Sequence, residues 1–152
     1  MNDIPVADVI QRFEGLLLSF DFEEECRILE IGKLHVVKRR NALRELKALY
    51  IALWKIALDK SLPEKSEEIF QGFIERIPET LDYNDNAAAF LRRRIAVYDT
   101  LLEPTKEQNF NEVSSKLLST VTKRKELKEN QVLKLSLHVR KVYTLLFKKL
   151  IP

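Results

Sequence analysis

The 152-residue sequence has few residues that interrupt regular secondary structure: it contains three glycines and five prolines. Three glycines are too few for a turn-rich β sandwich or for a glycine-rich loop that binds phosphate groups. The apolar residues form no uninterrupted run of the roughly 20 that a membrane-spanning helix needs. We therefore expect a mainly helical chain without a transmembrane segment.

Cysteine is nearly absent as well. Cys26 is the single cysteine, so the chain can form no intramolecular disulfide and no cysteine-rich metal site. The N-terminus lacks a basic segment followed by an apolar core, which argues against a signal peptide. Together these features predict a cytoplasmic location.

The two histidines give no pattern for a metal or a catalytic centre. Di-iron helical bundles need Glu-x-x-His pairs, but Gly32 precedes His35 by three residues and Leu135 precedes His138 by three. Cys26 follows three glutamates, which disfavour its thiolate. We therefore expect no catalytic residues, no metal and no cofactor. Enzymatic activity is left undecided, with a non-enzymatic role favoured.

Residues 41–58 form the stretch around which the rest of the chain is expected to pack. Its large apolar residues recur at spacings of three and four, and Lys47, Lys55 and Asp59 mark a narrow polar stripe. A helix with so little polar surface belongs in the middle of a fold. We predict an all-α, single-domain bundle over residues 1–152, with five to seven helices around this central one.

The other helices are predicted from apolar periodicity and from their start signals. Asp21 can cap the second helix, Ser61-x-x-Glu64 has the spacing of a capping box, and Asn84 or Asp85 can cap a helix from residue 86. Further along, Thr105 and Gln108 can cap another. The predicted helices cover approximately residues 5–20, 61–77, 86–103, 108–121 and 131–150, with a second helix starting near 21–25.

Residues 26–37 allow two interpretations. Their apolar residues do not share one helical face, and Gly32-Lys33 suits the turn of a short hairpin. An isolated hairpin is only marginally stable, and no other stretch reads convincingly as a strand. We favour a helix here, with Gly32 as a possible break.

Charge is distributed in blocks, although the net charge is only +3. Residues 1–32 and 61–85 are acidic, residues 33–60 are basic, and residues 131–152 contain five basic residues and no acid. Such blocks most simply pair with one another or face solvent.

The last helix has two distinct faces and contains the first candidate site. Lys134, Lys141 and Lys148 are seven residues apart and therefore nearly stacked, with Leu137 and Leu145 beside them. Exposed leucines next to positive charge suit the rim of a protein interface better than a groove for phosphates. We predict that these five residues contact an acidic patch of another protein or of a second copy of this chain.

A second candidate site is an anion-binding cleft. If the helix continues through Gly32, His35 and Arg39 extend the apolar face of the central helix, and Arg94 lies four residues from Phe90 and Tyr98. His35, Arg39 and Arg94 could then line one cleft. The alternative is that their stems merely cover apolar surface.

Three functions follow from these candidates. The favoured one is a non-enzymatic helical protein-interaction module with a basic C-terminal helix face, which binds another protein or a second copy of itself. The next is an electrostatic nucleic-acid-binding protein that uses the same face. The third is a binder of a small anionic ligand, or an enzyme, that uses Arg39, His35 and Arg94.

Overall fold

The computed structural model describes residues 4–102 and 110–151, and every regular element in these ranges is a helix. The predicted all-α fold is confirmed. The described residues form eight helices, the central one and seven others, which agrees with the predicted number. The shortest helix is α5 (Ile77–Thr80), which contains Pro78, although the preceding helix was expected to end at residue 77. Proline is tolerated there because the amides of a first helical turn need no helical partner.

The central helix α3 runs from Val36 to Ser61 and is longer than the predicted 41–58. Trp54 is one of its most deeply buried side chains. The indole stacks on Phe13 of α1 (Val6–Ser19), with ring centroids 4.0 Å apart and planes 4° apart. Phe73 of α4 (Ser66–Glu75) meets both rings edge-on, at 5.1 and 5.2 Å. The predicted position of this helix at the centre of the core is confirmed.

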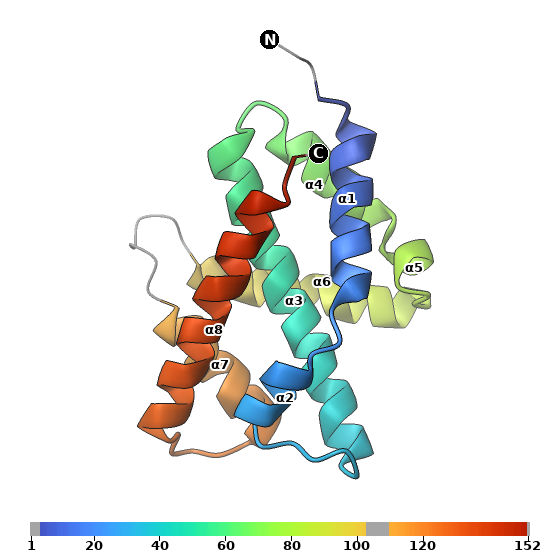
Figure 1. Ribbon diagram of the computed structural model, residues 1–152. Helices are drawn as coiled ribbons and strands as arrows, with labels where there is room; N and C mark the ends of the chain where they lie inside the picture. The colour runs from blue at the N-terminus through green and yellow to red at the C-terminus, as the bar shows by residue number, and fades with distance from the viewer. Residues whose placement is uncertain (1–3, 103–109, 152) are drawn as a thin grey trace.

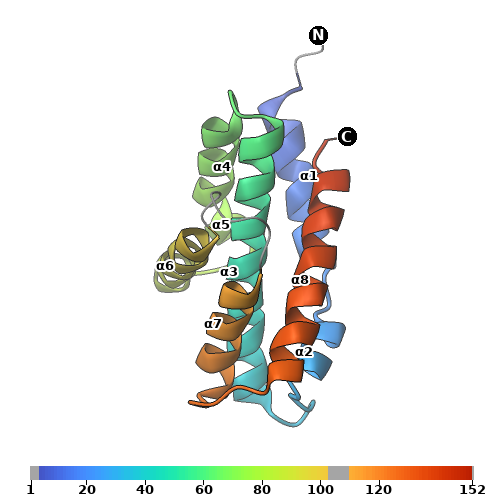
Figure 2. The ribbon, with the colours of Figure 1, turned by 90° about the vertical axis from the view of Figure 1, so that its left-hand side faces the viewer.

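The other helices surround α3 on several sides (Figures 1 and 2). Figure 2 shows α4 and α7 (Asn111–Thr122) one below the other along one side of α3, with α1 and α8 (Glu129–Lys148) on the opposite side. Helix α6 (Asp85–Leu101) crosses behind α3 in Figure 1 at a steep angle. The buried apolar residues of all these helices belong to one core.

Two predicted helix starts have different outcomes. The Asn84 side chain accepts a hydrogen bond from the amide of Ala87 (2.8 Å) and caps α6, as predicted. The predicted capping box at Ser61 is wrong, because Ser61 is the last residue of α3 and the next helix begins at Ser66. The central helix is stabilised by its buried face and continues past this local signal. The caps predicted at Thr105 and Gln108 lie outside the described residues.

The stretch from residue 26 to 37 is neither a hairpin nor one continuous helix. Helix α2 (Glu23–Ile28) ends early, residues 29–35 form turns, and Val36 begins α3. Glu30 has a left-handed backbone (φ 59°), which breaks the helix. Leu29 and Ile31 are both buried in this turn, which explains why the apolar residues follow no helical period.

Both ends of the bundle are built from chain segments that are distant in sequence. In both ribbon views the α2–α3 and α7–α8 links lie at one end of the bundle. The first residues of α1 and the last residues of α8 lie at the other end. At the first end, Glu30 joins the two links through ion pairs with Lys128 (3.1 Å) and Arg124 (3.9 Å). No helix within the described ranges is long and apolar enough to cross a lipid bilayer.

Candidate functional site

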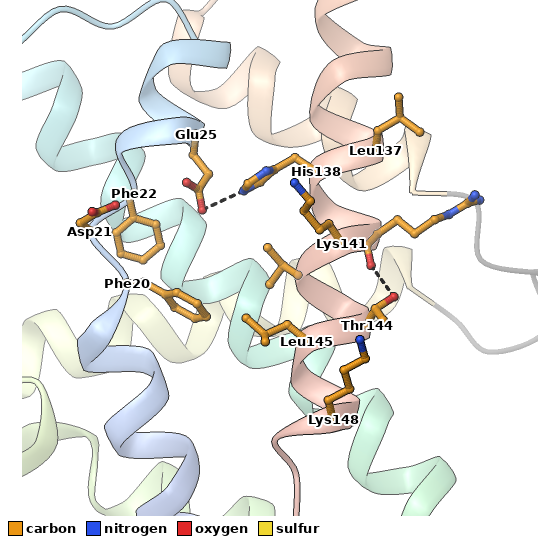
Figure 3. Close-up of a pocket in the computed structure, with 12 residues that line it drawn as sticks. Phe20, Asp21, Phe22, Glu25, Leu137, His138, Lys141, Thr144, Leu145 and Lys148 are labelled. Carbon is orange, nitrogen blue, oxygen red and sulfur yellow. Dashed lines mark hydrogen bonds and ion pairs between the residues drawn. The ribbon is translucent and has the colours of Figure 1, made fainter.

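An open depression lies between α8 and the segment that joins α1 to α2 (Figure 3). We call it the α8 groove. Its volume is about 660 Å³. The α8 groove is lined by Phe20, Asp21, Phe22, Glu25, Leu137, His138, Arg140, Lys141, Val142, Thr144, Leu145 and Lys148.

One wall of the α8 groove is aromatic. Phe20 packs edge-on against Tyr50 of α3 (centroids 5.5 Å apart), and Phe22 lies 5.9 Å from the same ring. Phe22 has a left-handed backbone (φ 59°) just before α2, and its side chain is buried. Figure 3 shows Phe20 and Leu145 pointing toward each other across the groove. The wall is therefore apolar and held in place by the core.

A polar contact lies at one side of this wall. The buried Glu25 carboxylate accepts a hydrogen bond from the Tyr50 hydroxyl (2.5 Å) and lies 3.3 Å from His138 Nε2. Burial by itself raises the pKa of Glu25, but the hydrogen bonds from His138 and Tyr50 outweigh it and lower this pKa. Burial and the Glu25 charge raise the pKa of Tyr50 well above its usual value. The contact therefore links α2, α3 and α8 with a charged carboxylate at neutral pH.

The predicted interaction surface on the last helix is largely part of this groove. Leu137, Lys141, Leu145 and Lys148 line it, and Lys134 does not. Leu137 is 56% exposed, and Leu145 is half-buried. Within the described ranges, Lys141 and Lys148 have no ion-pair partner. Sequence reasoning missed Phe20 and Phe22, whose part in the groove depends on the packing of α2 against α8.

Arg94 does not have the surroundings expected of a residue that binds an external anion. Its guanidinium contacts the buried carboxylate of Glu45, with Nη2 at 2.8 Å and Nε at 3.0 Å. The Tyr98 hydroxyl donates to the same carboxylate (2.8 Å). Burial lowers the pKa of Arg94, but the contacts with Glu45 outweigh this and raise it. The charge of Arg94 is thus compensated inside the α3–α6 contact.

The other two residues of the predicted anion cleft lie near the start of α3. His35 precedes the helix, and its Nδ1 accepts a hydrogen bond from the Gly32 amide (3.3 Å). Arg39 forms an ion pair with Glu23 of α2 (3.0 Å). Arg39 lines a cavity whose lining contains neither His35 nor Arg94, so the three residues do not converge there.

This second cavity, which we call the α3 cavity, lies along the first half of α3 and has a volume of about 520 Å³. Arg40, Arg44 and Lys47 recur at spacings of four and three, which places them on one face of the helix. That spacing within the basic block was the signal that could have revealed the site. The cavity is lined by Lys33, Val36, Arg39, Arg40, Leu43, Arg44, Lys47, Tyr83 and Ala87.

In residues 4–102 and 110–151, no three His, Cys, Asp or Glu side chains lie close enough to hold a metal ion. No protein-family model matches the chain, and no curated protein or solved structure matches it significantly. The chemistry of the two depressions is therefore the basis for the functional proposals below.

Proposed function

We propose that this protein is a protein-interaction module that binds an acidic amphipathic helix of a partner protein in the α8 groove. The observation that carries the proposal is an apolar wall beside lysines that lack ion partners. Phe20, Val142 and Leu145 supply apolar surface, and Lys141 and Lys148 flank it on the same helix. An amphipathic helix with glutamates beside its apolar stripe matches both features.

The dimensions of the groove support a helical occupant. Its lining on α8 extends from Leu137 to Lys148, which corresponds to roughly 16 Å along a helix axis. A partner helix of similar length presents apolar residues at three- and four-residue spacing to this wall. The two lysines are seven residues apart and can meet acids two turns apart on that helix.

Two features favour a protein partner over a nucleic acid. The exposed Leu137 and the Phe20 ring offer apolar contacts, whereas phosphates need cations and polar groups. The carboxylates of Asp21 and Glu25 also line the groove. A partner helix can place neutral residues opposite them, whereas a nucleic acid carries a negative phosphate at every nucleotide.

The test uses a synthetic peptide as the probe: an acidic helix with leucines at three- and four-residue spacing, alongside a scrambled peptide of equal composition. We expect the first peptide to shift NMR signals of Phe20, His138 and Leu145, and the scrambled one to leave them unchanged. Replacing Leu137 and Leu145 together with serine should weaken binding about tenfold or more, because apolar anchors dominate such interfaces. Replacing Lys134, Lys141 and Lys148 with glutamine should mainly slow association and reduce its salt dependence.

Leu133 provides a matched control, because it is on the same helix, is 57% exposed and does not line the groove. Leu133→Ser should leave peptide binding unchanged. Equal losses in Leu133→Ser and Leu137→Ser would contradict the groove as the site. If sedimentation instead shows a dimer that the Leu137 and Leu145 changes abolish, the occupant is a second copy. If the lysine variant loses binding to arbitrary RNA with a flattened salt slope, the nucleic-acid function replaces this proposal.

A further inference from the structure

The α3 cavity contains a concentration of positive charge that the proposed function does not use. Five of its lining side chains are cationic, and none is a carboxylate. Arg39 pairs with Glu23, but Lys33, Arg40, Arg44 and Lys47 have no ion-pair partner in residues 4–102 and 110–151. The cavity therefore has a positive potential that attracts anions.

Aromatic rings hold two of these cations in place. The Arg44 guanidinium lies 4.8 Å from the centre of the Phe90 ring, and the Lys47 ammonium lies 5.8 Å from that of Tyr83. A cation over a ring keeps its charge and loses freedom of movement. These two side chains are thus preorganised for an anion at low entropic cost.

Exposed aliphatic side chains lie directly beside this cavity. Leu34 is 95% exposed, Val36 is 67% exposed and Val37 is 60% exposed. They account for three of the seven large hydrophobic residues exposed in the described ranges and fall within four consecutive positions. Val36 also lines the α3 cavity. The α2–α3 link that carries Leu34 forms one end of the bundle in both ribbon views (Figures 1 and 2).

We infer that this end of the bundle docks on a membrane surface containing anionic phospholipids. Leu34, Val36 and Val37 enter the boundary between head groups and acyl chains, as the apolar side of an interfacial segment does. Lys33 and Arg40 lie close to these residues in the sequence and bind lipid phosphates. Arg44 and Lys47, roughly 12 and 16 Å from Val36 along α3, add to the positive potential. Lys123 and Lys125, in the exposed α7–α8 link at the same end, add positive charge toward the bilayer.

The combination of side chains favours a bilayer over other anionic surfaces. A nucleic acid would satisfy the cations but offers no apolar region for three aliphatic side chains. A free phosphate compound would occupy the cavity and leave Leu34 in water. A bilayer provides both phosphates and an apolar layer at adjacent depths. This inference is independent of the α8 groove.

The test measures cosedimentation of the full chain with vesicles. One set is pure phosphatidylcholine, and the other contains about one-fifth phosphatidylserine to give a negative surface potential. We expect binding to the second set, little binding to the first, and weaker binding as salt is added. Equal binding to both sets, or no binding to either, would overturn the inference.

Variants separate insertion from attraction. Leu34→Ser combined with Val37→Ser should reduce vesicle binding about tenfold. The two serines have little apolar surface to transfer from water into the bilayer. Changing Lys33, Arg40 and Lys47 to glutamine should reduce binding to anionic vesicles by a similar factor. Leu18→Ser is the matched control: Leu18 is 60% exposed on α1, and its variant should bind normally. Thermal unfolding of each variant checks that it is folded.

Two further measurements identify other anions. In the first, inositol hexakisphosphate binds in the absence of vesicles, and the Leu34 and Val37 changes do not affect vesicle binding. That result would mean that the site binds a free phosphate compound and that the membrane inference is wrong. Binding of a single-stranded RNA that is likewise insensitive to these two changes, in the absence of vesicle binding, would assign the surface to nucleic acid instead.

Discussion

The two halves of α3 have opposite surroundings although they belong to one continuous helix. From Ala48 to Leu58, nearly every side chain is buried, and Trp54 contacts aromatic rings of α1 and α4. From Val36 to Lys47, the helix presents two exposed valines and a face of cations. One helix therefore serves both as the centre of the core and as a wall of a charged surface cavity.

The contacts that hold each half differ in kind. The first half is linked to its neighbours by Arg39–Glu23, Arg44–Phe90 and Glu45–Arg94. The second half is held mainly by close apolar packing, to which Tyr50–Glu25 and Lys55–Asp99 add polar contacts. Apolar burial contributes in proportion to area, whereas charged pairs depend on their geometry and on solvent. Three predictions test this difference.

The largest expected effect is a cavity in the second half. Leu53 is completely buried, and Leu53→Ala should lower the free energy of unfolding by about 2–5 kcal/mol, because transfer and cavity terms add. Val37→Ala, at an exposed position of the first half, should change it by less than about 0.5 kcal/mol. Denaturant unfolding measures both values. A loss below about 1 kcal/mol in Leu53→Ala would contradict the proposed asymmetry.

A somewhat smaller effect is expected where α3 meets α6. Arg94→Met leaves the buried Glu45 carboxylate without its cation and should cost about 2–4 kcal/mol, somewhat less than a fully buried pair because Arg94 is partly exposed. If Arg94 lined a ligand cleft, as one of the two sequence interpretations has it, the same change would alter stability little. Adding Glu45→Gln should recover part of the loss, because the uncompensated charge is removed. A double variant less stable than Arg94→Met would indicate that Glu45 has another role.

The smallest effect concerns the contact of Tyr50 with Glu25. The pKa of Glu25 is lowered in the folded state, so the unfolded state binds more protons as the pH falls. The stabilisation by Glu25 is therefore present above its ordinary pKa of 4.5 and is lost as the pH falls below that value. Glu25→Gln should cost about 1–2 kcal/mol at pH 7 and flatten the stability curve in acid. An unchanged slope between the variant and the unaltered protein would contradict this role.

The sequence by itself determined the elements whose signals are local. The apolar face of the last helix was predicted from the spacing of six residues. Five of them are buried and Val132 is partly buried; the six are Val132, Leu135, Val139, Val142, Leu146 and Leu150. The breadth of the apolar surface of α3 predicted its central place, because a helix without a polar face must be covered. These features repeat every few residues and need no knowledge of distant contacts.

Only the tertiary structure decided which distant residues meet. Arg94 and Glu45 are 49 positions apart, and nothing in the spacing near Arg94 indicates its partner. The α8 groove likewise needs Phe20 and Phe22 from the other end of the chain, and the α3 cavity needs Tyr83. Helical periodicity defines which face of a helix is apolar, but the neighbour that covers that face is selected by packing and charge compensation over the whole chain.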